Sequence, residues 1–312
     1  MNQKKVGIIG TGVIGAGTAT LLIGNEYQAV MLGRTQASCE KGYRNVVHNL
    51  DEMIELGLLT AEQKEACLPN LILTQSYEDL ADCCAVIESA SEKLEDKHEV
   101  MKKLEQVLDP KAVIGSTTSA ISANAIAQAL QHRERFMVTH SWNPPHLVPL
   151  VEIVVASETT EESLDAMKAL LEDLGRVPVV IRKDVPGFIG NRLQHALFRE
   201  ALHMIEEGIA TAEDIDKAVL NSFGPRYSSI GLMEFYDAAT LPLQYNVQSY
   251  LLPHLCNDTQ PQKPLTDALA RGDEGINTGK GVLDWSDKDL EDFAYRKIKP
   301  FLPYANWKVM KK

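Results

Sequence analysis

The segment THSWNPPHLVPLVEIV, residues 139–154, places a histidine and a carboxylate in an otherwise apolar stretch. His140 closes one predicted strand, and Glu152 lies inside the next, beyond the turn at residues 143–145. A turn between two strands brings such residues back together. A carboxylate bonded to one imidazole nitrogen fixes the tautomer and stabilises the imidazolium. The pair therefore has the parts of a general base that takes a proton from a hydroxyl group.

Two further side chains have chemistry that suits the same reaction. Ser119, in STTSAIS, follows a predicted strand and carries a hydroxyl that can donate a hydrogen bond. Asn191 lies on the first turn of a long predicted helix, where its amide could orient a substrate oxygen or the base. Each of these residues also has a structural interpretation. A histidine in an apolar run is more often a core residue, and His146 is an example. The segment STTS could be a helix cap, and Asn191 could be a packing amide. Taken together on a dinucleotide-binding fold, the set favours hydride transfer between a nicotinamide and a secondary alcohol.

The N-terminal segment predicts such a fold. KKVGIIG reads as a buried parallel strand that leads into GTGVIGAG, where Gly10, Gly12 and Gly15 match G-x-G-x-x-G. A helix over 13–25 and a second strand, QAVML, complete the strand, loop, helix, strand order that the motif requires. The glycines allow a tight turn and a close approach to a pyrophosphate, and the first helical residues, Val13 and Ile14, lie where backbone amides and the helix dipole bind anions.

The end of the second strand, Gly33-Arg34-Thr35, bears on the choice between NAD and NADP. NAD enzymes usually place Asp or Glu there to bind the ribose 2′-hydroxyl, and no carboxylate stands at Gly33. Arg34 could face a 2′-phosphate and stack on the adenine, and Thr35 could donate to the same phosphate. We therefore favour NADP. The alternative is that Arg34 is a solvated loop residue and the cofactor is NAD.

Alternating strand and helix patterns predict an α/β Rossmann domain with a doubly wound parallel sheet over residues 1–183. Ligands of such a sheet bind beyond the carboxyl ends of the strands, and this domain carries Ser119, His140 and Glu152. After IRKDVPG the strand pattern stops, and we expect an all-α domain over 184–312 that serves substrate binding and dimerisation. Its helices are expected at 188–208, 211–224 and around 231–253, 262–271 and 287–298.

Composition and charge exclude several classes of protein. The chain has 312 residues and a formal net charge of −12. Nucleic acids and anionic membranes both select basic surfaces, so we expect neither as a partner, and we interpret the basic tail KVMKK as a solvated terminus. There is no apolar run of about 18 residues and no signal-peptide core. The five cysteines show no metal-ligand spacing, so we expect no metal and assign them as reduced thiols in a cytoplasmic protein.

These segments resemble the L-3-hydroxyacyl-CoA dehydrogenase superfamily over nearly the whole chain. The likeness is carried by GTGVIGAG, ESASEKLEDK, STTS, HSWNP with LVEIV, and DVPGFIGNR. It implies that His140 is the general base with Glu152 as its partner, and that Ser119 and Asn191 hold the substrate oxygen. It also implies a substrate-binding role for Asn143, and positions near the nicotinamide end of the cofactor for Glu92 and Lys97.

Departures from the acyl-CoA members bear on the substrate. Those members carry a basic helix after the second strand, whereas this chain has NLDEMIELG there, with Asp51, Glu52 and Glu55, and Met53 where a CoA-binding lysine is expected. Negative charges would repel the phosphates of CoA. FGPRYSSIGLMEF and HSWNPPHLVPLVE instead resemble the branch that contains lambda-crystallin and carnitine dehydrogenase. In such a pocket Arg226 could clamp a free carboxylate, or it could form a surface salt bridge.

The leading hypothesis is a cytoplasmic, homodimeric, NAD(P)-dependent dehydrogenase that interconverts small 3-hydroxy and 3-oxo acids. One alternative is a 3-hydroxyacyl-CoA dehydrogenase, such as one acting on 3-hydroxybutyryl-CoA. An alternative of another class is a non-catalytic nucleotide-binding protein with a structural or sensing role. The intact histidine–glutamate pair argues against that class, because a pure binder does not need it.

Overall fold

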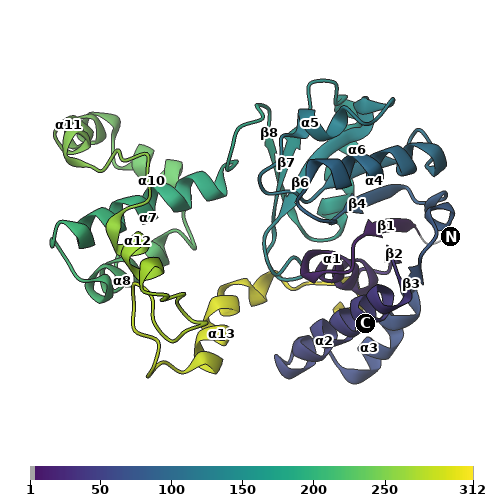
Figure 1. Ribbon diagram of the computed structural model, residues 1–312, viewed down its shortest axis with the longest axis horizontal. Helices are drawn as coiled ribbons and strands as arrows, with labels where there is room; N and C mark the ends of the chain where they lie inside the picture. Colours follow the sequence, from purple (N-terminus) through teal and green to yellow (C-terminus); the bar gives the residue numbers. More distant parts are fainter. Residues whose placement is uncertain (1–3, 312) are drawn as a thin grey trace. The chain divides into compact units, whose positions relative to one another are not determined.

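The computed structural model describes residues 4–311 and divides into two compact units (Figure 1). One unit runs up to Ile189 and takes in the chain again from Tyr295, and the other spans Gly190–Ala294. The structural boundary therefore lies slightly later than the predicted one at residue 184. The end of the chain, which we had assigned to the helical domain, belongs to the first unit.

A single sheet forms the centre of the first unit, with strand order β3-β2-β1-β4-β5-β6-β7-β8 among the described residues. Strands β1 to β6 are parallel, β7 runs antiparallel to β6, and β8 is parallel to β7. The predicted Rossmann fold is confirmed, and the antiparallel step arises because residues 142–149 join β6 directly to β7. The strands are β1 Lys5–Ile9, β2 Gln28–Leu32, β3 Leu71–Thr74, β4 Ala85–Glu88, β5 Val113–Ser116, β6 Phe136–Ser141, β7 Leu150–Val155 and β8 Val177–Ile181.

Helices cover both faces of the sheet, and alternate strand residues fill two separate cores. Ile8 and Met31 face a core shared with α1, α2 and α6, whereas Ile9 and Leu32 face a core shared with α4 and α5. Both faces are buried, which explains the nearly continuous apolar strands. The helices are α1 Val13–Gly24, α2 Gln36–Glu55, α3 Ala61–Cys67, α4 Leu94–Val107, α5 Ala123–Ala127 and α6 Glu161–Asp173, with short 3₁₀ turns η1 Leu68–Asn70, η2 Tyr77–Leu80 and η3 Arg133–Arg135.

The second unit is helical, as its sequence pattern predicts. Thr211 caps α8 by accepting a hydrogen bond from the backbone N–H of Asp214, in line with the expected Thr-x-x-Asp cap. No helix within residues 4–311 combines the length and apolarity that a membrane span requires. The remaining elements are α7 Gly190–Glu206, α8 Ala212–Leu220, α9 Phe223–Arg226, α10 Leu232–Ala238, α11 Leu241–Leu251, η4 Leu252–His254, α12 Lys263–Ala270, α13 Leu290–Ile298, η5 Lys299–Tyr304 and η6 Lys308–Lys311.

The tail of the chain packs on the first unit, so the expectation of a solvated terminus is wrong. Trp307 has no exposed surface, and a Cβ added at Gly24 of α1 would lie 2.4 Å from its indole ring. The backbone N–H of Lys308 donates to the side-chain oxygen of Asn25 at 3.1 Å, and its ammonium pairs with Asp173 at 2.6 Å. Burial of one large aromatic side chain outweighs the hydration of a few lysines, whose long stems leave the charge in water.

Candidate active site

His140 and Glu152 face each other across the β6–β7 hairpin, as the spacing predicts. They are directly opposed in the antiparallel register, and His140 Nδ1 lies 2.9 Å from Glu152 Oε2. The carboxylate is fully buried and the imidazole nearly so, with 8% of its surface exposed. A buried imidazole whose one nitrogen is bonded to a fixed carboxylate is the arrangement that a proton-accepting histidine requires.

The Glu152 carboxylate is held from two further directions. The indole N–H of Trp142 donates to Oε2 at 3.2 Å, and the backbone N–H of Ile189 donates to Oε1 at 2.8 Å. The ring of Phe188 lies 5.4 Å from the imidazole ring of His140, centroid to centroid. Hydrogen-bond donors that surround a buried carboxylate favour its charged form and fix its orientation.

Phe188 adopts a left-handed backbone conformation, with φ of 47°. This conformation costs a bulky residue about 1–3 kcal/mol and persists where the surroundings impose it, which is frequent at functional sites. It turns the chain so that the Phe188 ring packs on His140 and the N–H of Ile189 reaches Glu152. The roles of Phe188 and Trp142 were not predicted from the sequence, although both residues lie inside the motifs HSWNP and DVPGFIGNR.

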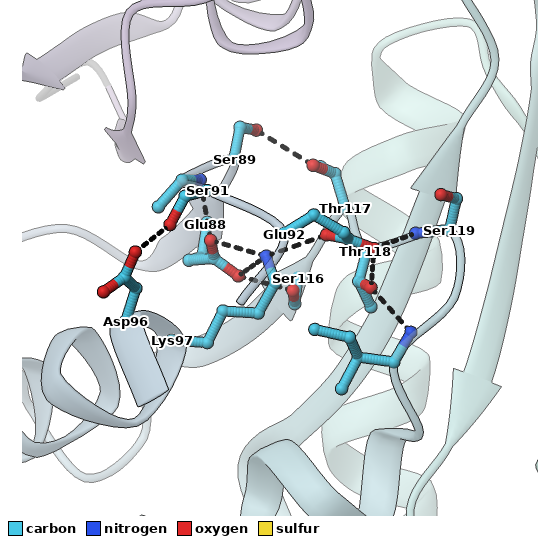
Figure 2. A network of polar contacts seen from close by, with 12 residues as sticks. Glu88, Ser89, Ser91, Glu92, Asp96, Lys97, Ser116, Thr117, Thr118 and Ser119 are labelled. Atoms are coloured by element: carbon cyan, nitrogen blue, oxygen red, sulfur yellow. Dashed lines mark hydrogen bonds and ion pairs between the residues drawn. The ribbon is translucent and has the colours of Figure 1, made fainter. Parts of the chain in front are cut away.

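Ser119 lies just beyond β5 with its side chain exposed, and a polar network holds the backbone around it (Figure 2). Glu92 accepts hydrogen bonds through Oε1 from the N–H groups of Ser119, at 3.0 Å, and of Ala120, at 3.3 Å. The same oxygen accepts from the hydroxyl of Thr118. The carboxylate of Glu92 therefore fixes the turn that presents the Ser119 hydroxyl.

Beneath this turn lies a buried ion pair. The ammonium of Lys97 on α4 lies 2.9 and 3.0 Å from the two carboxylate oxygens of Glu88 on β4, and both side chains are almost completely buried. Glu88 also accepts from the N–H of Ala90 and from the hydroxyl of Ser116 on β5. Figure 2 shows these groups converging from β4, β5 and α4. Glu88 and Ser116 were not predicted from the sequence, because their only signal is a polar residue at the end of an apolar strand.

Glu92 links the two parts of the network. Its Oε2 lies 3.5 Å from the Lys97 ammonium. Burial opposes ionisation of Glu92, but the Thr118 hydroxyl, the Lys97 charge and the two backbone N–H groups together lower its pKa below the ordinary value. Lys97, implied to lie near the nicotinamide, has 1% of its side chain exposed and binds carboxylates, whereas the Glu92 side chain is 43% exposed.

The glycine turn is shaped for close approach by a ligand. Gly10 has φ of 108°, and an added Cβ would lie 2.4 Å from the carbonyl oxygen of Ser89. A Cβ at Gly15 would lie 2.2 Å from the carbonyl oxygen of Gly10, which explains why both positions need glycine. At Gly12, apart from its two chain neighbours, no atom of residues 4–311 lies within 4 Å of an added Cβ. That space opens at the N-terminus of α1, where Val13 and Ile14 form the first turn.

A cavity of about 590 Å³ extends from this turn to the end of β2, and its lining includes Gly10, Gly12, Gly33, Arg34 and Ala90. Its size and its glycine-rich wall fit a dinucleotide.

The Gly33-Arg34-Thr35 stretch forms the entry to α2. Thr35 is the N-cap: its hydroxyl oxygen accepts from the N–H of Ser38 at 3.2 Å, and its own N–H donates to the Ser38 hydroxyl at 3.0 Å. Arg34 is exposed and lines the cavity. The first turn of α2 carries no acidic residue. A cation beside a helix N-terminus without a carboxylate is an anion-accepting environment.

The other predicted site residues are more dispersed. Asn143 lies exposed on the loop between β6 and β7, whereas Asn191 lies in the first turn of α7, in the second unit. Arg226, also in the second unit, stacks over the Phe235 ring at 4.4 Å. This contact tests neither the predicted carboxylate clamp nor the predicted surface salt bridge. His146 is buried and its pKa falls to about 4, chiefly through burial, so it is a neutral packing residue.

A glycine turn that opens a helix on a largely parallel sheet, together with a buried histidine–glutamate pair at the strand ends, defines a dinucleotide-binding dehydrogenase. Two family models match the chain. The 3-hydroxyacyl-CoA dehydrogenase NAD-binding domain matches residues 5–185, and the C-terminal domain of the same enzymes matches residues 187–285.

Individual relatives agree with these matches. An L-carnitine dehydrogenase from Oceanobacillus iheyensis is 36% identical over 238 residues, which cover 76% of each chain. A 3-hydroxybutyryl-CoA dehydrogenase from Bradyrhizobium diazoefficiens is 31% identical over 284 residues, 90% of this chain and 95% of the relative. The crystal structure of 5-formyl-3-hydroxy-2-methylpyridine 4-carboxylic acid 5-dehydrogenase, described as an NAD⁺-dependent dismutase, superposes with a TM-score of 0.85, at 25% identity and 99% coverage of both chains.

The chain belongs to the 3-hydroxyacyl-CoA dehydrogenase family. It is a nicotinamide-dependent oxidoreductase that acts on a CH–OH group of a small molecule. The predicted family and enzyme class are confirmed, as is the likeness to the branch that contains carnitine dehydrogenase. A purely structural or sensing role is thereby set aside.

Proposed function

We propose that the protein is an NADP-dependent dehydrogenase that interconverts a small, free 3-hydroxy acid and its 3-oxo acid. The buried His140–Glu152 pair, with 2.9 Å between Nδ1 and Oε2, carries the proposal. Such a pair suits the removal of a proton from a secondary alcohol. Ser119 and Asn191 are proposed to hold the reacting oxygen, and Asn143 and Arg226 to bind the rest of the substrate.

In the oxidative direction His140 accepts the hydroxyl proton at Nε2. Its Nδ1–H then donates to Glu152, whose negative charge stabilises the imidazolium that forms. The hydroxyl of Ser119 donates to the same substrate oxygen as negative charge develops there. The glycine turn and the first turn of α1 would hold the cofactor, and its nicotinamide would supply the acceptor for the hydride of the carbinol carbon. In the reductive direction the imidazolium returns the proton to the carbonyl oxygen.

The preference for NADP rests on the end of β2. Arg34 lines the cavity beside the N-terminus of α2, and Ser38 and Lys103 line the same cavity. The hydroxyl proton of Thr35 remains available for an acceptor, because the capping bond uses only its oxygen as acceptor. A phosphate dianion suits this environment better than a neutral ribose hydroxyl does. Asp96 and Glu99 also line the cavity, and the solved relative is described as NAD⁺-dependent, which supports the opposite outcome.

The surface of α2 supports a substrate without CoA. Met53 is fully buried, so the position implied for a CoA-binding lysine points into the core. Asp51 pairs with Lys64 at 2.5 Å, which neutralises a nearby cation, and Glu55 is exposed. The similarity to L-carnitine dehydrogenase favours a free 3-hydroxy acid. The runner-up, a 3-hydroxyacyl-CoA substrate, is favoured by the 3-hydroxybutyryl-CoA dehydrogenase that aligns over 90% of this chain.

Two experiments test these proposals. Fluorescence titrations with NADPH and NADH on wild type and Arg34→Ala should give tighter NADPH binding that is lost in the variant. NADH preference that is indifferent to Arg34 would overturn the NADP assignment. Turnover of L-carnitine and 3-hydroxybutyrate should exceed that of 3-hydroxybutyryl-CoA, and the reverse order would identify the runner-up.

We also propose a cytoplasmic homodimer that assembles through the helical unit. Leu193, Leu197 and Phe198 on α7 are each more than 40% exposed, and apolar surface of this kind favours association. The five cysteines are all free, as expected in a reducing compartment. Light scattering on the purified protein should give twice the chain mass of 34.5 kDa. A mass near that of one chain would refute the dimer.

A further inference from the structure

Residues 142–149, the connecting loop, join the strand of His140 to the strand of Glu152. The loop carries Trp142, whose indole binds Glu152, and the proposed substrate residue Asn143. The backbone N–H groups of Leu147 and Val148 both donate to the carbonyl oxygen of Pro144, at 3.0 and 2.9 Å, which closes a turn inside the loop. The position of this loop therefore affects both the proposed base and the proposed substrate contact.

A buried arginine lies against this loop. Arg176 is 4% exposed, and its Nη1 donates to the carbonyl oxygens of Pro145, at 3.4 Å, and Val148, at 3.1 Å. Its Nε donates to the carbonyl oxygen of Leu174 at 3.3 Å. Within the described chain, the hydrogen bonds of this guanidinium go to carbonyl oxygens. Burial lowers the pKa of Arg176 to about 10, so it still carries its charge at neutral pH.

A burial this costly needs a reason, because an ion-paired or apolar residue would fill the site at lower cost. The guanidinium has five N–H donors in a fixed plane, so it can fasten several carbonyl oxygens of one loop at once. An apolar residue could fill the space but could not orient the loop.

The end of the chain forms the rest of the support. The Nη2 of Arg176 donates to the carbonyl oxygen of Tyr304 at 3.4 Å. The ring of Trp307 meets the ring of His146, a loop residue, edge to face at 6.4 Å. The other side of the loop rests on α1, where a Cβ at Gly17 would lie 2.8 Å from Pro145. The family matches end at residue 285, so this support comes from a segment that they do not include.

We propose that Arg176 is a positioning residue for the dehydrogenase reaction. The segment 299–311 supports this role because it contacts both Arg176 and the connecting loop. The proposal rests on the proposed roles of His140, Glu152 and Asn143. No contact with the reacting atoms is proposed for Arg176 or Trp307. They act by fixing the loop that positions Trp142 and Asn143.

The test compares Arg176→Met, Arg176→Lys and a chain that ends at Asn306 with wild type. Leu104→Ala is the matched control, because Leu104 is fully buried in the other core of the same unit. Hydrogen exchange is followed by mass spectrometry on peptides that cover 142–149 and 113–118. Kinetics are measured with NADP⁺ and the hydroxy acid that the panel above identifies, and the Kd for NADPH is measured separately.

We expect Arg176→Met and the shortened chain to lose protection selectively in 142–149, by about tenfold in exchange rate. The substrate KM should rise by about 10- to 100-fold while the Kd for NADPH stays unchanged, because displacement by an ångström suffices for such a loss. Arg176→Lys should recover part of the effect, since an ammonium can still donate to two carbonyl oxygens. Leu104→Ala should lower stability without this selectivity.

The proposal is overturned if exchange at 142–149 matches wild type, or if protection falls equally across both peptides as in the control. Exchange needs no substrate, so it judges Arg176 even if no 3-hydroxy acid is turned over and the proposed function fails. If Arg176→Met does not fold, Arg176→Lys and the shortened chain decide the outcome by the same criteria.

Discussion

Replacement of Glu152 by glutamine isolates the charge of the proposed base, because the two side chains have the same shape. The carboxylate accepts from the N–H of Ile189 on Oε1, and from Trp142 Nε1 and His140 on Oε2, at 2.8, 3.2 and 2.9 Å. A carboxamide offers one acceptor oxygen and one donating NH₂ group. Either orientation therefore sets the NH₂ against an N–H donor, from Ile189 or from Trp142. The site is buried, so water cannot relieve the mismatch.

The expected loss follows from this geometry. With its NH₂ toward His140, the glutamine donates to Nδ1 and leaves the imidazole proton on Nε2, where a base needs a lone pair. The opposite orientation keeps the tautomer but removes the charge that stabilises the imidazolium. We expect kcat to fall by about 10³- to 10⁴-fold, the range of related acid-to-amide changes. One mismatched buried donor should also lower the free energy of unfolding by about 1–3 kcal/mol.

Glu158→Gln is the matched control, because Glu158 is an exposed carboxylate paired with Arg133 at 3.1 Å. Steady-state turnover, the Kd for NADPH and thermal unfolding are measured on both variants. Glu152→Gln should lose turnover while binding cofactor as wild type does, and Glu158→Gln should change neither. Turnover of Glu152→Gln within tenfold of wild type, in folded protein, would refute the assignment of the pair as the base.

Three further predictions concern the structure around the site. Lys97→Met leaves the Glu88 carboxylate buried without its cation. The free energy of unfolding, measured in urea, should therefore fall by about 3–5 kcal/mol. A fall below about 1 kcal/mol would contradict the buried pair. The pKa of His146 is lowered from 6.5 to about 4, chiefly by burial. As the pH falls from 6.5 to 4, the unfolded chain therefore takes up a proton at this histidine before the folded chain does. The free energy of unfolding should fall over this range by up to about 3 kcal/mol. His146→Leu should therefore flatten the fall of Tm with acid, and an unchanged acid slope would exclude this origin. Gly12→Ala meets no protein atom, so it should keep wild-type Tm yet weaken NADPH binding, whereas equal affinity would place the pyrophosphate elsewhere.

Much of the first unit could be predicted from the sequence, because its signals are local. Apolar runs bounded by glycine predicted the bounds of β1 and β2 closely, because a strand buried on both faces needs a continuous apolar sequence. The contact between His140 and Glu152 was also predictable, because a short loop joins the two strands and leaves little freedom of register.

Other features depend on contacts between distant parts of the chain and left no local signal. The strand Leu71–Thr74 was missed because it is a short edge strand, defined by pairing with β2. The docking of the tail was missed because Trp307 finds its site on α1, far away in sequence. Thr35 was considered only as a phosphate ligand, although its hydroxyl also caps α2. In each case the contacting residue determines the local structure, and one stretch of sequence does not show which residue it will contact.

The partners of two buried carboxylates separate a structural role from a chemical one. Glu88 ends β4, and Glu152 lies on β7 opposite His140; both are fully buried, and each accepts a backbone N–H. Glu88 faces the ammonium of Lys97, which has hydrogen-bond donors and no acceptor, so this pair holds its surroundings in place. Glu152 faces His140, an imidazole, whose second ring nitrogen can accept a proton from a substrate. Of these two carboxylates, only Glu152 therefore has a partner that can carry a proton to and from a substrate, which is why the sequence spacing of that pair points to the reaction.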